Sequence, residues 1–293
     1  MELNKKLILV RGAGDLASGI IWSLAYAGLR VVAVDIEKPS CIRTTVSYSD
    51  AIYDGTKTLN GLTCVHVTDV NDIEYIHEQG KIALMIDKEA EILKTIKFDV
   101  VVDAILAKRN TGTTIDMADI VIGVGPGFIA GIDCHYAIET MRGHTLGTIY
   151  ETGSPIPDTG TPGLIASHSS DRVMHSPCEG IFHNVHKIGD IVMKGEVLSN
   201  VEEYVDGKPT GKMVELYASI DGLLRGILRD GFYARNGLKC ADIDPRISEH
   251  DNAFTISDKS RAIGNATLCA VLHGLSAIEE RENKFFKLEY LNV

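Results

Sequence analysis

The segment from Leu7 to Asp35 constrains the fold more than any other part of the chain. A short apolar run at residues 7–10 is followed by Arg11 and the glycine turn at residues 12–14, and the apolar residues after that turn recur at helical spacing. A second apolar run then ends at Asp35. The order strand, turn, helix, strand within about 30 residues is that of a βαβ unit. We therefore expect a parallel sheet to begin here.

Further short apolar runs continue this pattern. Residues 83–86, 100–102 and 120–122 show no polar alternation, as is typical of strands buried on both faces of a parallel sheet, and residues 88–96 between them are a helix candidate. The sequence predicts an α/β protein whose residues 1–150 form a Rossmann-type doubly wound parallel sheet that binds a nucleotide or cofactor.

The second half of the chain repeats itself. Glycines recur with a constant offset of 42 residues, at Gly180 and Gly222, Gly189 and Gly231, and Gly195 and Gly237. This indicates two copies of one β unit, so we expect a small duplicated all-β domain at residues 170–246. Residues 151–169, rich in Gly, Pro, Ser and Thr, predict a linker or functional loop. Residues 247–293 are expected to form a C-terminal helical segment docking on the N-terminal domain.

Composition excludes several classes of partner. The net charge of −11 argues against a broad surface for nucleic acid or for an anionic membrane. The apolar stretch of residues 7–36 is interrupted by charged residues, so it predicts neither a signal sequence nor a membrane span. The six cysteines include no CxxC pair, which favours reduced thiols and a cytoplasmic protein.

The glycine turn predicts an anion site. Gly12 allows the tight turn, Gly14 lets a phosphate approach the backbone, and the following helix N-terminus offers unpaired N–H groups. Asp35 lies where a carboxylate accepts hydrogen bonds from a ribose diol. Asp15, inside the turn, would lie close to a pyrophosphate and leaves open a ligand other than NAD. The alternative is a turn kept only for packing.

A second glycine-rich segment carries the candidate reactive groups. Gly125 and Gly127 follow an expected strand and predict a loop at the carboxyl edge of the sheet. Asp133, His135 and Glu139 come next, with His135 and Glu139 on one face if a helix forms there. We expect these three to border the same pocket as the glycine turn and to act as catalytic acid and base groups. Hydrogen-bonded side chains that only shape the pocket are the alternative, and metal content is undetermined.

Basic side chains extend the predicted cofactor-binding set. Arg109 follows a buried strand and could meet a ligand phosphate, although solvated surface charge is an equal alternative. Arg43 follows the second strand, where an arginine can meet a 2′-phosphate. Arg142 and His144 are expected to border the reactive end of the ligand.

Several motifs together resemble a known family. They are the glycine turn with its flanks at residues 10–19, the segments at residues 107–110, 125–128 and 138–144, and the tripeptide at residues 257–259. In this combination the chain resembles the YqeB-like family of selenium-dependent molybdenum hydroxylase system proteins. Separately, the repeat resembles the barrel-sandwich hybrid of biotinyl and lipoyl modules in a lysine-free form, a likeness of fold only.

The family resemblance implies a pathway. It implies an accessory protein that acts during maturation of a molybdenum hydroxylase apoprotein. The protein would handle a dinucleotide-type cofactor, either molybdopterin-type or NAD(P). Homo-oligomers are left open. The alternatives are an NAD(P)-dependent oxidoreductase and an adaptor without a small ligand. Lys208 and Lys212 are the only lysines between the repeats and lack the modification hairpin, so no biotin or lipoyl group is expected.

Overall fold

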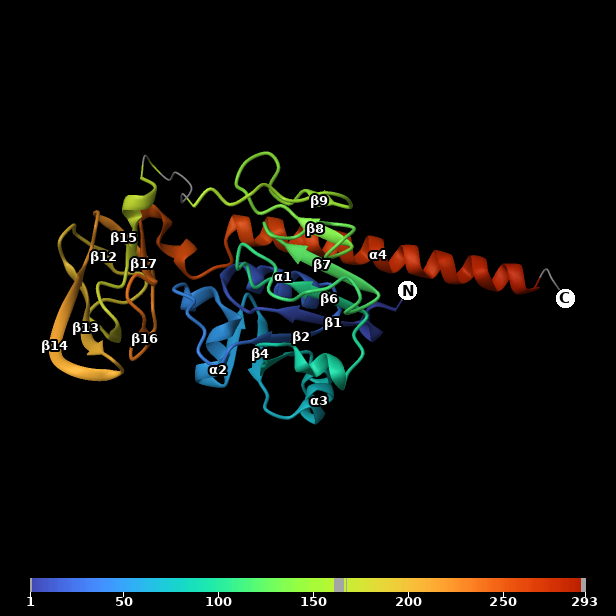
Figure 1. Cartoon of the computed structure of the whole chain (residues 1–293), viewed down its shortest axis with the longest axis horizontal. Helices are drawn as coiled ribbons and strands as arrows, with labels where there is room; N and C mark the ends of the chain where they lie inside the picture. The colour runs from blue at the N-terminus through green and yellow to red at the C-terminus, as the bar shows by residue number, and fades with distance from the viewer. Residues whose placement is uncertain (1, 161–165, 167, 291–293) are drawn as a thin grey trace. The chain divides into compact units, whose positions relative to one another are not determined.

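The computed structural model describes residues 2–160, 166 and 168–290, with side chains up to residue 281 (Figure 1). Residues 161–165 and 167 of the expected loop, and residues 291–293 of the expected helical segment, lie outside the described residues. The chain divides into two compact units. The first contains Met1–Glu37, Tyr48–Asp158 and Ser257–Val293, and the second contains Lys38–Ser47 and Thr159–Ile256.

The first unit is built on a nine-stranded sheet in the order β3-β4-β5-β2-β1-β6-β7-β8-β9. Its strands are β1 (Leu7–Arg11), β2 (Arg30–Asp35), β3 (Thr56–Leu59), β4 (Leu62–His66), β5 (Ile82–Ile86), β6 (Val100–Asp103), β7 (Ile120–Val124), β8 (Tyr136–Ile138) and β9 (Ile149–Tyr150). The strands from β4 to β8 in this order are parallel, whereas β3 and β9 at the two edges are antiparallel to their neighbours.

Few helices accompany this sheet. They are α1 (Asp15–Tyr26), α2 (Ala51–Asp54), α3 (Ile73–Glu78) and α4 (Asp258–Tyr290), with 3-10 turns η1 (Leu3–Lys5), η3 (Tyr48–Asp50), η4 (Val70–Asp72) and η5 (Glu91–Lys94). The expected helix at residues 88–96 is therefore only the single turn η5. One buried cluster joins Leu9 and Val101 of the sheet to Ile73 and Ile76 of α3.

The expected Rossmann-type doubly wound parallel sheet is wrong. The sheet is mixed, because antiparallel strands close both of its edges. The connections from β6 to β7 and from β7 to β8 contain no helix, so helices do not alternate with strands as they do in a doubly wound fold. The βαβ unit made of β1, α1 and β2 remains as a local feature.

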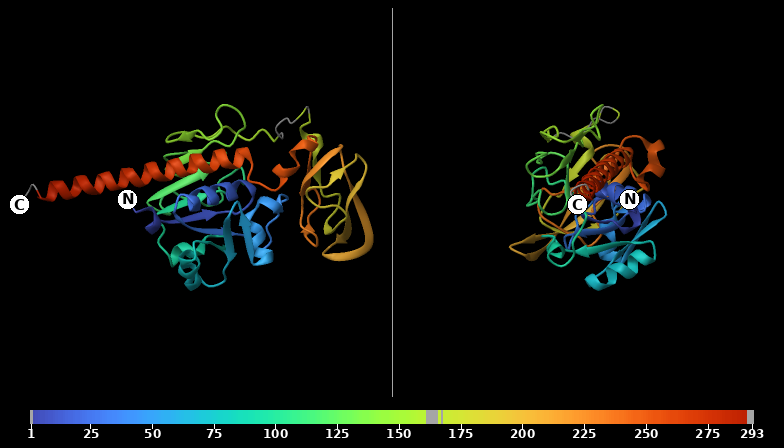
Figure 2. Two further views of the ribbon diagram at one scale, coloured as in Figure 1. Left: turned by 180° about the vertical axis from the view of Figure 1, so that it is seen from behind. Right: turned by 90° about the vertical axis from the view of Figure 1, so that its right-hand side faces the viewer.

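Helix α4 packs along α1. A Cβ atom on Gly19 would lie 2.4 Å from the carbonyl oxygen of Ser260, and one on Gly264 would lie 2.4 Å from that of Gly19 and 2.5 Å from Oγ of Ser23. Going from Ser260 to Gly264 along α4 thus moves the contact from Gly19 toward Ser23 along α1. The two helices are therefore parallel and begin at the same end. Figures 1 and 2 show α4 running beside α1 and continuing past the sheet.

By length and composition alone, the stretch Ile247–Arg281 could cross a membrane. A core helix passes the same test, and the α4 part of this stretch buries Ile263, Ala270 and Val271. The stretch is weak evidence for a membrane span.

The second unit consists of two four-stranded antiparallel sheets, in the orders β10-β17-β15-β12 and β14-β13-β11-β16. The strands are β10 (Val173–His175), β11 (Gly180–Asn184), β12 (Ile191–Val192), β13 (Val197–Val205), β14 (Lys208–Tyr217), β15 (Gly222–Ile227), β16 (Tyr233–Ala234) and β17 (Lys239–Asp244). The unit also contains η2 (Thr44–Val46), η6 (Ser170–Arg172) and η7 (Ile247–Ala253).

The strands of the second unit recur with the sequence repeat. β15, β16 and β17 each begin 42 residues after β11, β12 and β13. The corresponding strands lie in different sheets, so each sheet contains strands from both copies. Phe182, Leu198, Leu223 and Ile243 pack in one buried cluster. This arrangement of two antiparallel sheets replaces the expected barrel-sandwich hybrid, which has no support beyond the repeat itself.

Candidate functional site

The glycine turn after β1 is held tightly on both sides. Gly12 has a φ of +96°, and a Cβ atom there would lie 2.8 Å from the carbonyl oxygen of Ala104. Its N–H donates to the carbonyl oxygen of Val34 (2.7 Å), and the N–H of Ser49 donates to that of Ala13 (2.8 Å). Only glycine fits at position 12, so this turn fixes where α1 begins.

Asp35 at the end of β2 caps this turn. Its two carboxylate oxygens accept hydrogen bonds from the N–H groups of Ala13 (2.8 Å) and Ile36 (2.7 Å). Burial raises the pKa of Asp35, and these two backbone hydrogen bonds oppose the rise. The carboxylate therefore shapes the turn directly, and each oxygen retains acceptor capacity for a ligand hydroxyl.

The N-terminus of α1 is open. Gly14 is its N-cap, no side chain caps the helix, and a Cβ atom on Gly14 would meet nothing within 4 Å. Unlike Gly12, Gly14 has a φ of −68°, which any residue adopts. A side chain at position 14 would thus meet no protein atom at its Cβ, and the helix dipole favours an anion near this helix end. Asp15 in the first turn is the one acidic residue of that turn.

The N-terminus of α4 lies beside that of α1. Oγ of Ser260 donates to the carbonyl oxygen of Asp15 at 2.8 Å. Arg142 forms a two-pronged ion pair with Asp258, at 2.9 and 3.2 Å. Lys259 is half-buried, and burial and the charge of Arg142 lower its pKa. Two helix N-termini and two cationic side chains therefore meet at the carboxyl edge of the parallel strands.

Glu139 organises the loop after β8. It is fully buried, its Oε1 accepts from the N–H groups of Thr140 and Met141 (both 2.7 Å), and its Oε2 accepts from that of Ile156 (2.7 Å). With these three hydrogen bonds the carboxylate of Glu139 fixes the backbone of the loop after β8. The expected helix carrying both His135 and Glu139 does not form, because β8 lies between them.

Gly125 and Gly127 allow close packing at the same edge. A Cβ atom on Gly127 would lie 2.4 Å from Cα of Arg109, and one on Gly125 would lie 3.2 Å from Oγ1 of Thr140. Both glycines have positive φ. They thus bring the loops after β6 and β8 against the loop after β7. The side chain of Arg109 itself is exposed.

A buried charge cluster at this edge was not expected from the sequence. Arg11, Asp103 and Thr113 are each at most 3% exposed. Nη1 of Arg11 lies 3.3 Å from Oδ2 of Asp103, which also accepts from Oγ1 of Thr113 at 2.6 Å. Arg11 and Asp103 are register partners at the ends of β1 and β6. One feature of the sequence pointed to this cluster, namely that Arg11 and Asp103 each come directly after an apolar run.

Two expected catalytic residues lie away from this edge. His135 precedes β8, at the opposite end of that strand from Glu139, and its Nδ1 accepts from the N–H of Val121 at 3.0 Å. Burial and the charge of Arg281 lower the pKa of His135. Asp133 accepts from the N–H of Ile129 within a turn (2.8 Å). The structure therefore does not bring Asp133 and His135 to the glycine turn.

The remaining expected residues divide between the two units. His144 is exposed in the loop that Glu139 begins. Arg43 belongs to the second unit, where its Nη2 donates to the carbonyl oxygen of Asn252 at 3.2 Å. Among the described residues, no group of three or more His, Cys, Asp and Glu side chains could hold a metal ion.

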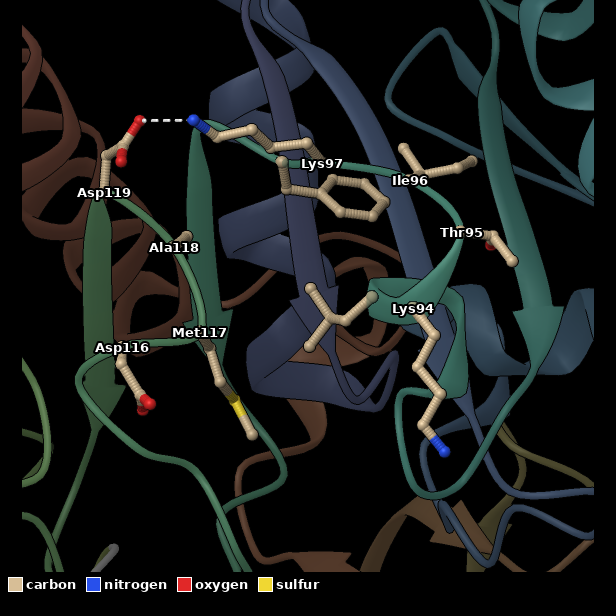
Figure 3. Close-up of a pocket in the computed structure, with 10 residues that line it drawn as sticks. Lys94, Thr95, Ile96, Lys97, Asp116, Met117, Ala118 and Asp119 are labelled. Atoms are coloured by element: carbon tan, nitrogen blue, oxygen red, sulfur yellow. Dashed lines mark ion pairs between the residues drawn. The ribbon is translucent and has the colours of Figure 1, made fainter.

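A cavity of about 610 Å³ lies elsewhere, at the amino ends of β6 and β7 (Figure 3). It is lined by Phe98, Met117 and the charged side chains of residues 94, 97, 116 and 119. Nζ of Lys97 lies 3.5 Å from the carboxylate of Asp119, and Figure 3 marks this ion pair with a dashed line. The cavity is at the opposite ends of these strands from the glycine turn, so it is separate from the anion-binding edge.

Gly14, Lys259 and Arg142 lie at the carboxyl edge of the parallel strands, and this edge is the candidate anion site. The chain is thus an α/β protein with a mixed sheet and a candidate anion site at one edge. Comparison of sequences finds a similar curated protein. The chain is 40% identical over 279 residues to an Escherichia coli (strain K12) protein described as "Uncharacterized protein YqeB". The match covers 94% of this chain and 50% of that protein, so the chain spans about half the length of the curated relative it matches. No family model matches the chain.

Similarities to solved structures are distant. A succinylglutamate desuccinylase/aspartoacylase from Rhodobacter sphaeroides is 14% identical, with a TM-score of 0.27, over 81% of this chain and 85% of that one. An aspartoacylase family protein from Mesorhizobium loti is 13% identical, with a TM-score of 0.24, over 81% and 84%. The protein TcdA (CsdL) is 15% identical, with a TM-score of 0.25, over 42% and 49%. TM-scores this low support no inference about the fold or the function of this chain.

Proposed function

We propose that the chain is an accessory protein that holds the phosphate-bearing part of a dinucleotide-type cofactor during maturation of selenium-dependent molybdenum hydroxylases. The observation that carries the binding part is the open N-terminus of α1 at Gly14, directly after the tight turn at Gly12. The maturation part rests on the motif resemblance, together with the similarity to YqeB. A cytoplasmic location and the hydroxylase apoprotein as partner belong to the same proposal.

The donor set fits a pyrophosphate joined to a ribose. The α1 amides would face a phosphate across the space at Gly14, and the Asp35 oxygens have acceptor capacity left for ribose hydroxyls. A molybdopterin-type dinucleotide and NAD(P) both carry these groups. Mass spectrometry of the native protein from its own host identifies a co-purifying dinucleotide by mass. Turnover of a nicotinamide with any substrate would favour the alternative of an NAD(P)-dependent oxidoreductase.

Replacing Gly14 by valine should weaken ligand binding while the fold persists. The φ of Gly14 suits any residue and a Cβ atom there meets no protein atom within 4 Å, so we expect the added methyl groups to enter the space assigned to the phosphate. We expect at least a tenfold loss of affinity for NAD or for the co-purifying dinucleotide, about the effect of losing one or two hydrogen bonds to a charged group. Isothermal titration calorimetry measures the change.

Two variants control this experiment. Gly14→Ala adds only Cβ and should have a smaller effect than valine. Tyr26→Val adds a β-branched residue to the far end of α1, where the side chain is 71% exposed, and should leave affinity unchanged. Equal dissociation constants for Gly14→Val and the unaltered chain, at equal unfolding midpoints, would contradict the proposed function.

A further inference from the structure

Strand β14 leaves one side of its backbone unpaired. It stands at the end of the order β14-β13-β11-β16, and β13 is its neighbour in the described part of this sheet (Figure 1). Most of its residues are exposed. A strand at the edge of a sheet offers a row of free N–H and C=O groups to another strand. The backbone of β14 can therefore accept a further strand.

The first half of β14 is protected against such pairing. Pro209 has no N–H to donate, and Gly211 has a φ of +80°. The register between β13 and β14 shifts between Glu202 and Tyr204, opposite this half. Proline and β-bulges are devices that keep edge strands from pairing. The addition of a strand is therefore hindered along residues 208–212.

The second half of β14, residues 213–217, is regular. Met213, Val214, Glu215 and Leu216 pair in unbroken register with β13. This half contains no proline and no residue with positive φ. The side chain of Met213 is half exposed, and an exposed apolar residue on a regular edge favours pairing with another strand. This half is therefore the part of β14 to which a strand can be added.

The outward N–H groups of this half belong to Met213, Glu215 and Tyr217. The N–H of Ala218 donates to the carbonyl oxygen of Glu196, on the β13 side, at 2.8 Å. Because the hydrogen-bonding direction alternates from residue to residue along an antiparallel strand, the N–H groups of residues 213, 215 and 217 point away from β13. Their side chains are all exposed and lie on one face of the sheet.

This exposed face is acidic. Glu215 lies on it, and Glu202 is the register partner of Met213 on the same face. In the part of the chain that the structure describes, no lysine or arginine lies within ion-pair distance of either glutamate, and Glu202 faces His183 at 3.9 Å. An added strand would place alternate side chains next to this row. Basic side chains fit there, since they would meet the carboxylates and the ring of Tyr217.

We propose that residues 213–217 of β14 bind an extended segment of a partner protein in which basic and apolar residues alternate. The basic side chains would lie beside Glu202 and Glu215, and the apolar ones would continue the inner face formed by Val214 and Leu216. Backbone hydrogen bonds supply affinity and the alternating side chains supply specificity when a strand is added to a sheet. The surface lies within the second unit and does not depend on cofactor binding.

Fluorescence anisotropy of the full chain with a labelled peptide, acetyl-Lys-Val-Lys-Val-Lys-Val-Lys-amide, tests the proposal. We expect this peptide to bind at least about tenfold more tightly than one of equal composition whose lysines and valines form two separate blocks. The block peptide carries the same charge. Equal affinities would reduce the interaction to attraction by the net charge of −11 and would overturn the proposal.

Two substitutions at one position separate the backbone from the charge. Glu215→Ala keeps the outward N–H and removes one exposed charge, so affinity for the peptide should fall by about two- to fivefold. Glu215→Pro also removes the N–H but no hydrogen bond to β13, and affinity should fall by at least about tenfold. Glu89→Ala, at an exposed glutamate of the first unit, should bind as the unaltered chain does. Equal losses in the two Glu215 variants, at equal unfolding midpoints, would contradict backbone pairing.

A change in the peptide serves if Glu215→Pro fails to fold. Two further peptides carry N-methyl groups, one on its lysines and the other on its valines. Each modification removes the N–H donors from one side of an extended peptide. One of the two peptides should lose at least about tenfold in affinity, whereas the other should bind as the unmethylated peptide does. Equal affinities of the two would overturn the proposal.

Amide hydrogen exchange locates the contact. In the free chain the N–H groups of Met213, Glu215 and Tyr217 should exchange faster than those of Val214 and Leu216, which point toward β13. The peptide should slow the first three. Slower exchange that spares these three residues would show that the peptide binds elsewhere.

Analytical ultracentrifugation tests whether a second copy of the chain covers this edge instead. We expect Glu215→Pro to leave the sedimentation coefficient of the free chain unchanged. If the unaltered chain is a dimer that Glu215→Pro converts to a monomer, β14 pairs with itself and the proposal is overturned.

Discussion

Replacing Asp103 by alanine should lower the free energy of unfolding by about 3–5 kcal/mol, because it leaves the buried guanidinium of Arg11 without its counter-ion. Arg11 is 3% exposed and Asp103 is 1% exposed, so water cannot take the place of the carboxylate. Nη1 of Arg11 lies 3.3 Å from Oδ2 of Asp103. Urea unfolding followed by circular dichroism measures the change.

Two further variants separate the ion pair from its hydrogen bond. Thr113→Val removes the hydroxyl that donates to Asp103 and accepts from Arg11, so it should cost about 1–3 kcal/mol. The double variant Arg11→Met with Asp103→Ala removes both charges and should recover much of the stability lost in Asp103→Ala. A cost of Asp103→Ala no larger than that of Thr113→Val would show that Arg11 finds another partner.

Replacing Glu139 by alanine should destabilise the first unit by about 1–3 kcal/mol, the cost of leaving the buried N–H of Thr140 without its acceptor. The N–H groups of Met141 and Ile156 also lose their acceptor, but these residues are partly or largely exposed, so water can replace the carboxylate there. Amide hydrogen exchange at these three positions should accelerate, which is a readout specific to this loop.

Glu151→Ala is the control for Glu139→Ala. The side chain of Glu151 is 69% exposed, and its ion pair with His273, at 3.9 Å, is at the surface. Loss of such a pair costs at most about 1 kcal/mol. If Glu139→Ala were no more destabilising than this control, the buried carboxylate would not be what holds the loop.

Local structure near the glycine turn was predictable from the sequence, since it depends on neighbours in the chain. The turn at Gly12, the helix from Asp15 and the strand ending at Asp35 follow from residue type and spacing. The buried strands β5, β6 and β7 follow from their apolar runs. The mixed character of the sheet was not predictable, because β3 has only one buried residue and β9 only two residues in all.

The candidate site was only partly predictable because its side chains come from distant segments. Gly14 and Asp35 could be identified from their positions after consecutive strands. Lys259 could not, because its place depends on how α4 packs on Gly19, more than two hundred residues earlier. His135 was expected at the glycine turn because its segment follows an expected parallel strand, but β8 places it at the opposite end of that strand from Glu139.

The packing of Gly264 on Gly19 also sets an order of events during synthesis. Chains generally fold as they leave the ribosome, N-terminal segments first. The glycine turn emerges early, but its partner helix α4 is translated only after the whole of the second unit. Until then α1 exposes the surface that Gly264 later covers, and the lysine beside Asp15 has not yet been made. A nascent chain of this protein would therefore lack the packed form of α1 until α4 has left the ribosome.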